Sequence, residues 1–141
     1  MNQDELRQAL MMLDMYKAQL ETLAGQIQIL QYSVEEVARA RETISKIAEA
    51  AEDDEILMPV GANSFVYAKV ASNSKALIGI GSKLSVEKDM SDAVKTMDSN
   101  LEEITQALKE VTVQSSELEA RAKQLSSIVQ QEYQKLQEQG L

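Results

Sequence analysis

The middle of the chain, residues 56–87, has the sequence ILMPVGANSFVYAKVASNSKALIGIGSKLSVE and differs in kind from both of its flanks. Its apolar residues recur at about every second position, and β-branched residues and glycines are frequent there, which is typical of short strands. Turn-forming residues interrupt it at Gly61-Ala62-Asn63-Ser64, Ser72-Asn73-Ser74-Lys75 and Gly81-Ser82. We therefore predict two hairpins, with strands at residues 56–60, 65–71, 77–80 and 84–86.

The sequence before this segment carries a heptad repeat over about residues 3–51. Counting Tyr as apolar, 13 of 14 seam positions are apolar, where a 44% apolar composition gives about six by chance. Arg41 is the exception, and we expect it to set the register or to extend its charge to solvent. The two series are Leu6, Leu13, Leu20, Ile27, Val34, Arg41 and Ala48, and Ala9, Tyr16, Leu23, Leu30, Val37, Ile44 and Ala51.

The sequence after the hairpins, about residues 89–139, shows the same repeat. Twelve of 14 seam positions are apolar, the exceptions being Ser115 and Glu132, and Asp89 is a candidate N-cap. Two helices of matching length, joined through a short β segment, pair antiparallel so that each covers the seam of the other. The series are Met90, Met97, Ile104, Val111, Leu118, Leu125 and Glu132, and Val94, Leu101, Leu108, Ser115, Ala122, Val129 and Leu136.

The predicted fold is mainly α with a small β part: an antiparallel two-helix coiled coil joined by two β-hairpins. Two short hairpins are marginally stable alone, and their edges carry unpaired backbone groups. We therefore expect the hairpins of several chains to assemble into an oligomeric β-barrel. The expected parts are an N-terminal coiled-coil helix (1–52), a hairpin assembly head (53–88) and a C-terminal coiled-coil helix (89–141). The candidate assembly residues are Val66, Val70, Leu77, Ile78, Ile80, Leu84 and Val86.

The composition excludes several classes of chemistry. The chain has no His and no Cys, so it offers neither imidazole nor thiolate for catalysis, and no usual zinc, haem or iron–sulfur ligands. A net charge of −9 opposes binding to nucleic acid phosphates. No apolar run approaches the roughly 20 residues that span a bilayer. We expect a cytoplasmic protein that is not an enzyme and has no catalytic residues, cofactor, metal, nucleic acid or membrane partner.

Two local patterns could suggest a binding site. The acidic run from Glu52 to Glu55 lacks the spacing of a calcium loop, and we interpret it as a solvated helix exit, with steering of partners as the alternative. The stretch Gly79-Ile80-Gly81-Ser82 lacks the third glycine, the lysine and the following helix of a nucleotide-binding loop. Its glycines instead favour close packing or a bend in a strand.

The free end of the coiled coil carries more apolar side chains than its seam needs. Two interpretations remain open: these residues widen the seam or contact a neighbouring chain, or they form an adaptable surface for unfolded proteins. Methionine suits the second role because its flexible, polarisable side chain fits many shapes. The candidate binding residues are Leu6, Leu10, Met11, Met12, Met15, Ile128, Tyr133 and Leu136.

The order helix, two hairpins, helix resembles the alpha subunits of archaeal-type prefoldin, with Met58-Pro59-Val60-Gly61 opening the β segment and Leu77-Ile78-Gly79-Ile80-Gly81 near its middle. The resemblance implies an ATP-independent chaperone with two alpha and four prefoldin beta subunits. It also implies that distal coiled-coil tips capture unfolded client proteins and deliver them to a group II chaperonin. The alternative is a structural spacer or tether that contacts one defined partner.

Overall fold

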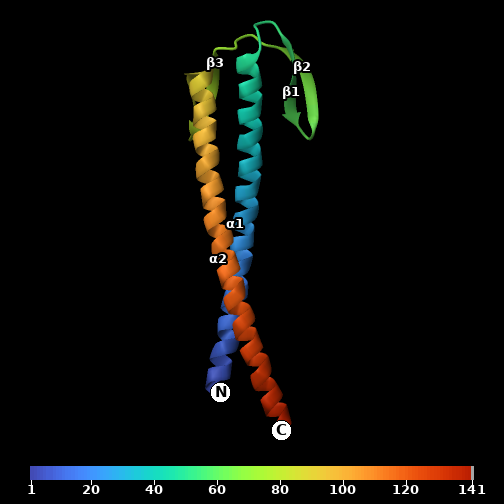
Figure 1. Ribbon diagram of the computed structural model, residues 1–141, viewed down its shortest axis with the longest axis vertical. Helices are drawn as coiled ribbons and strands as arrows, with labels where there is room; N and C mark the ends of the chain where they lie inside the picture. The colour runs from blue at the N-terminus through green and yellow to red at the C-terminus, as the bar shows by residue number, and fades with distance from the viewer. Residues whose placement is uncertain (141) are drawn as a thin grey trace. The chain divides into compact units, whose positions relative to one another are not determined.

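The computed structural model describes residues 1–140 and shows two long helices, joined along the chain by two hairpins (Figure 1). The chain forms two compact units. The terminal unit contains Met1–Gln31 and the described part of Gln106–Leu141, and the hairpin unit contains Tyr32–Thr105. The elements are α1 (Gln3–Glu49), β1 (Glu55–Gly61), β2 (Ser64–Lys69), β3 (Lys75–Gly81), β4 (Leu84–Asp89) and α2 (Met90–Glu138).

The predicted seam is the side of each helix that is removed from solvent. Every seam position of α1 is buried or half-buried, whereas Ala51 lies beyond the helix and is exposed. The same holds for α2 except at Leu136, which is exposed. In the terminal unit the most buried side chains are Ala9 on α1 and Val129 on α2. The heptad prediction is therefore confirmed in both helices.

The two charged interruptions of the seam have partners. Arg41 on α1 donates from Nε to the carboxylate of Asp98 on α2 within the hairpin unit. Glu132 on α2 lies 3.3 Å from the N-terminal ammonium group within the terminal unit. Residues late in α1 thus meet residues early in α2, and the first residue of the chain meets the end of α2. Each unit contains the two helices in antiparallel orientation, and Arg41 bridges them through Asp98.

The two hairpins share one design. In β1–β2, Pro59 pairs with Phe65 and Gly61 with Ser64, which leaves Val60 as an extra, bulged residue. In β3–β4, Gly79 pairs with Ser85 and Gly81 with Leu84, which leaves Ile80 bulged. Both turns have positive φ at their two central residues, Ala62 and Asn63 in one and Ser82 and Lys83 in the other. This is the type I′ geometry whose twist matches that of the strands.

Gly81 provides a test of this turn design. Its φ is +99°, whereas Gly79, two residues earlier, has no positive φ, and added methyl groups at both positions meet only open space. We expect Gly81→Ala to destabilise the hairpin by about 1–3 kcal/mol through backbone strain alone. Gly79→Ala, the matched control, should be neutral or stabilise by up to about 1 kcal/mol. Urea unfolding of both variants measures the difference, and equal midpoints would contradict it.

Short hydrogen bonds fasten the exit of α1 to the hairpins. The Asp54 carboxylate accepts from the amide of Ala51 at 2.9 Å, and the Asp53 amide donates to the carbonyl of Val70 at 2.8 Å. The side-chain amide of Asn73 donates to the carbonyl of Ala50 at 2.8 Å, which satisfies a carbonyl at the helix end. The acidic run is exposed as predicted, but Asp54 also closes the turn between α1 and β1.

The hairpin unit has a small core on one side of β3–β4. Val70, Ile78, Met90 and Ala93 are its buried residues. In the same unit, the Lys88 ammonium group donates to the Thr96 hydroxyl at 2.9 Å, and the Met90 amide donates to the carbonyl of Ser74 at 2.8 Å. The second hairpin is thus packed against the start of α2.

Two sequence-based boundaries differ from the structure. Asp89 is the last residue of β4, paired with Lys75, and α2 begins one residue later, at Met90, so Asp89 stands at the N-cap position and not inside the helix. β1, β3 and β4 are longer than predicted, because ladder pairing includes charged residues such as Glu55 opposite Lys69, whereas β2 ends at Lys69, two residues before the predicted end at 71. Among the described residues, no helix is long and apolar enough to cross a membrane.

Candidate functional site

An apolar turn of α1 in the terminal unit is the first candidate site. Residues 9–16 have the sequence ALMMLDMY, in which Asp14 is the only charged side chain. Ala9, Leu13 and Tyr16 occupy the seam, so the remaining apolar residues have no place between the helices. A two-helix coiled coil normally has polar residues at these outer positions.

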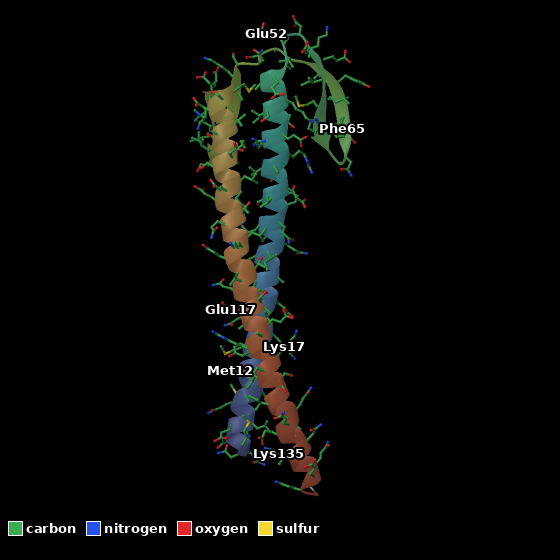
Figure 2. The ribbon with its side chains drawn as sticks, in the orientation of Figure 1. Met12, Lys17, Glu52, Phe65, Glu117 and Lys135 are labelled. Carbon is green, nitrogen blue, oxygen red and sulfur yellow. The ribbon has the colours of Figure 1, made fainter. Side chains whose placement is uncertain are left out.

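The structure leaves these outer side chains in solvent. Met11 is 64% exposed and Met15 is 58% exposed, and Met12 and Leu10 are exposed as well. Figure 2 shows Met12 as a side chain on the α1 part of this unit. We call Leu10, Met11, Met12 and Met15 the apolar collar. Met11 and Met15 lie mostly in solvent, whereas Leu10, at 37%, and Met12, at 47%, are partly covered by the chain beside the seam.

The end of α2 adds apolar residues to the same unit. Ile128, Tyr133 and Leu136 are exposed, whereas Leu6 on α1 is half-buried and belongs to the seam. Leu136 is also a seam position by its spacing, but it lies beyond Glu132, which already meets the first residue of the chain, Met1. Of the predicted binding residues, all except Leu6 are therefore accessible.

The hairpins carry the second candidate site, and here the structure divides the predicted residues. Leu77 is 73% exposed, and Val66, Ile80, Leu84 and Val86 are also exposed. Ile78 and Val70, in contrast, are only 2% and 3% exposed within the single chain. These two residues stabilise the subunit itself, so they are not free to contact another chain as the sequence had led us to expect.

Sequence reasoning missed part of the exposed hairpin surface. Leu57, Val60, Phe65 and Tyr67 are all exposed on β1–β2, and Tyr67 lies directly opposite Leu57 in the ladder. Partners in an antiparallel ladder place their side chains on the same face. The two-residue turn fixes which residues of the two strands face each other, so this face could have been predicted from the sequence.

A groove of about 520 Å³ lies between α1 and the first hairpin, entirely within the hairpin unit. Its apolar lining includes Ile47, Ile56 and Phe65, and Figure 2 shows Phe65 on this hairpin. Its rim carries the charged side chains of Arg39, Glu42 and Lys46. No residue of β1 or β2 is fully buried, so this hairpin is less covered by its own chain than the second one.

Two features of the described residues bear on a metal site and on a phosphate-binding loop. No group of three or more Asp or Glu side chains in residues 1–140 is placed to hold a metal ion. The glycines near Ile80 form a strand and its turn rather than a phosphate-binding loop followed by a helix. What the geometry presents instead is exposed apolar surface, in the collar and on the hairpins.

Comparison with known proteins connects this architecture to one family. The family model described as "Prefoldin subunit" matches residues 16–135. The chain is 32% identical over 135 residues to prefoldin subunit alpha 1 of Methanocaldococcus jannaschii, covering 96% of this chain and 92% of the relative. It is 29% identical over 135 residues to prefoldin subunit alpha of Pyrococcus horikoshii, covering 95% and 91%.

Solved structures share the fold. A chain in the cryo-EM structure of filamentous PFD from Methanocaldococcus jannaschii matches with a TM-score of 0.64 and 23% identity, over 82% of this chain and 95% of that one. The crystal structure of the prefoldin beta subunit from Thermococcus strain KS-1 matches with a TM-score of 0.60 and 20% identity, over 90% of each chain. With the two helices, the two hairpins and the family match in agreement, the chain belongs to the prefoldin subunit family.

Proposed function

We propose that this chain is the alpha-type subunit of an ATP-independent chaperone that captures unfolded polypeptides with the free ends of its coiled coil. The observation that carries the proposal is the apolar collar: four exposed apolar side chains outside a seam that is already complete. Met11, Met12 and Met15 supply flexible, polarisable contacts that suit clients of many shapes. Membership of the prefoldin family supports the same function.

The proposed mechanism is binding without chemistry or cofactor. A single collar makes weak contacts, because a large apolar side chain contributes only about 1.5–3 kcal/mol even when fully buried. Several tips that hold one client at the same time raise the overall affinity while each contact stays reversible. The proposal therefore requires an oligomer.

The hairpins are the proposed assembly element. Their exposed apolar residues and open strand edges would be covered by the hairpins of other subunits in a shared β-barrel. The similarity to alpha subunits and to a beta-subunit structure supports a hetero-oligomer with beta subunits. Following the family resemblance, we propose two alpha and four beta subunits in the cytoplasm, with delivery of clients to a group II chaperonin.

Aggregation of unrelated denatured proteins tests this function against that of a spacer. The chain is assembled with its beta-type partner, and light scattering is followed after dilution of several denatured proteins of different sequence. A chaperone suppresses scattering of all of them, since apolar contacts carry little sequence specificity. Suppression of none, or of one defined protein only, would favour a spacer or tether and overturn the proposal.

A further inference from the structure

All of the sulfur in this chain is in methionine, and it is unevenly exposed. The chain has seven Met and no Cys. In the collar, Met11, Met12 and Met15 are each between 47% and 64% exposed. In the hairpin unit, Met90 is buried, and Met58 and Met97 are half-buried. A soluble oxidant therefore meets the collar methionines before those of the hairpin unit.

We propose that Met11, Met12 and Met15 form a reversible oxidation site that switches off client binding when it reacts with hydrogen peroxide. The thioether sulfur attacks one peroxide oxygen, a sulfur–oxygen bond forms and the oxygen–oxygen bond breaks. Sulfur loses two electrons to become the sulfoxide, and the second peroxide oxygen leaves as water after proton transfer. Since the chain has no thiol, no cysteine competes for the oxidant within it.

The position of the three residues determines what oxidation changes. They lie within one and a quarter turns of α1, about 6 Å along the helix axis from Met11 to Met15. Their neighbours Ala9, Leu13 and Tyr16 hold the seam and contain no sulfur. Sulfoxides at these positions make the outer surface polar while the contacts between the helices stay unchanged. The switch thus acts on the client surface and spares the coiled coil.

This inference rests on the proposed function, and its experiment separates the two. The chain, assembled with its partner, is treated with hydrogen peroxide, and peptide mass spectrometry measures sulfoxide at each methionine over time. We expect Met11, Met12 and Met15, together with Met1, which is 52% exposed, to react first and Met90 last. Loss of client affinity of about tenfold should accompany oxidation of the collar, with unchanged helical circular dichroism. Methionine sulfoxide reductases A and B should restore it.

Two variants locate the effect. Met11→Leu, Met12→Leu and Met15→Leu together keep an apolar collar, so this variant should protect clients and stay insensitive to peroxide. Met90→Leu with Met97→Leu, the matched control, should stay sensitive. Because the partner subunit is the same in each complex, oxidation of its own methionines cannot produce this difference. Failure of the untreated complex to protect would overturn the proposed function and the switch together, before any peroxide is added. Collar sulfoxides with full protection, or peroxide sensitivity of the leucine variant, would overturn only the switch.

Discussion

Replacing Leu77 and Ile80 with aspartate is expected to release this chain from its assembly while leaving its helices intact. Both side chains are mostly exposed within the subunit, at 73% and 58%, so the subunit loses little of its own packing. In an assembled barrel each buried apolar side chain contributes about 1.5–3 kcal/mol, and a buried aspartate adds a desolvation cost. Together these effects should weaken assembly by roughly a hundredfold or more. Sedimentation velocity measures the loss.

The choice of Leu77 in place of its neighbour Ile78 matters for this test. Ile78 is 2% exposed within the chain, so aspartate there would disrupt the hairpin unit itself and confuse unfolding with release. Gln26→Glu with Gln28→Glu, on exposed positions of α1, adds the same two negative charges outside the hairpins. This control should assemble normally. An intact oligomer in the aspartate variant, at full helical content, would show that the hairpins are not the assembly element.

Polar substitution of the collar is expected to have the largest effect on client protection. Leu10→Gln, Met11→Gln, Met12→Gln and Met15→Gln together remove four exposed apolar side chains, and glutamine keeps a helix propensity close to that of leucine and methionine. Since the seam is untouched, assembly should persist while most protection of a denatured protein is lost. Met11→Ser alone should do far less, because several side chains and several tips share one client. Light scattering with assembled complexes compares the variants.

The matched control for the collar uses equally exposed apolar residues elsewhere in the terminal unit. Ile29 is exposed on α1 and Val113 on α2, and neither belongs to the collar. Ile29→Gln with Val113→Gln should leave protection nearly unchanged. If this control loses as much protection as the collar variant, clients bind to exposed apolar surface in general. Full protection by the collar variant would place client binding elsewhere, such as the hairpin surface or the partner subunit.

The coiled coil could be predicted from the sequence because its cause is local and repeated. A spacing of alternately three and four residues places one face of a helix toward its partner, whatever the rest of the chain does. The charged exceptions pair across the same seam: Arg41 donates to Asp98 on the other helix, and Glu132 lies beside the N-terminal ammonium group. The turns could also be predicted from the sequence, since Gly61 and Gly81 supply the positive φ that a tight hairpin needs there.

The exposed collar could also be predicted, although for a different reason. Once the seam was assigned, Met11 and Met15 were left on the outer face of a helix with no second partner in the chain. Helix geometry fixes the direction of each side chain, so the excess was visible before any tertiary structure was known. Whether clients bind there is decided by experiment and remains our proposal.

Only the tertiary structure decided which side of each hairpin the chain covers itself. Leu77 and Ile78 are adjacent and both apolar, so alternation alone cannot choose between the faces. The choice follows from how the chain leaves α1, through the bonds of Asp53 and Asn73, and how β4 runs directly into α2. With these connections Ile78, Val70 and Ala93 are each buried, and Leu77 is exposed. The period of a sequence fixes which residues share a face, but the path of the chain between elements determines which face is buried.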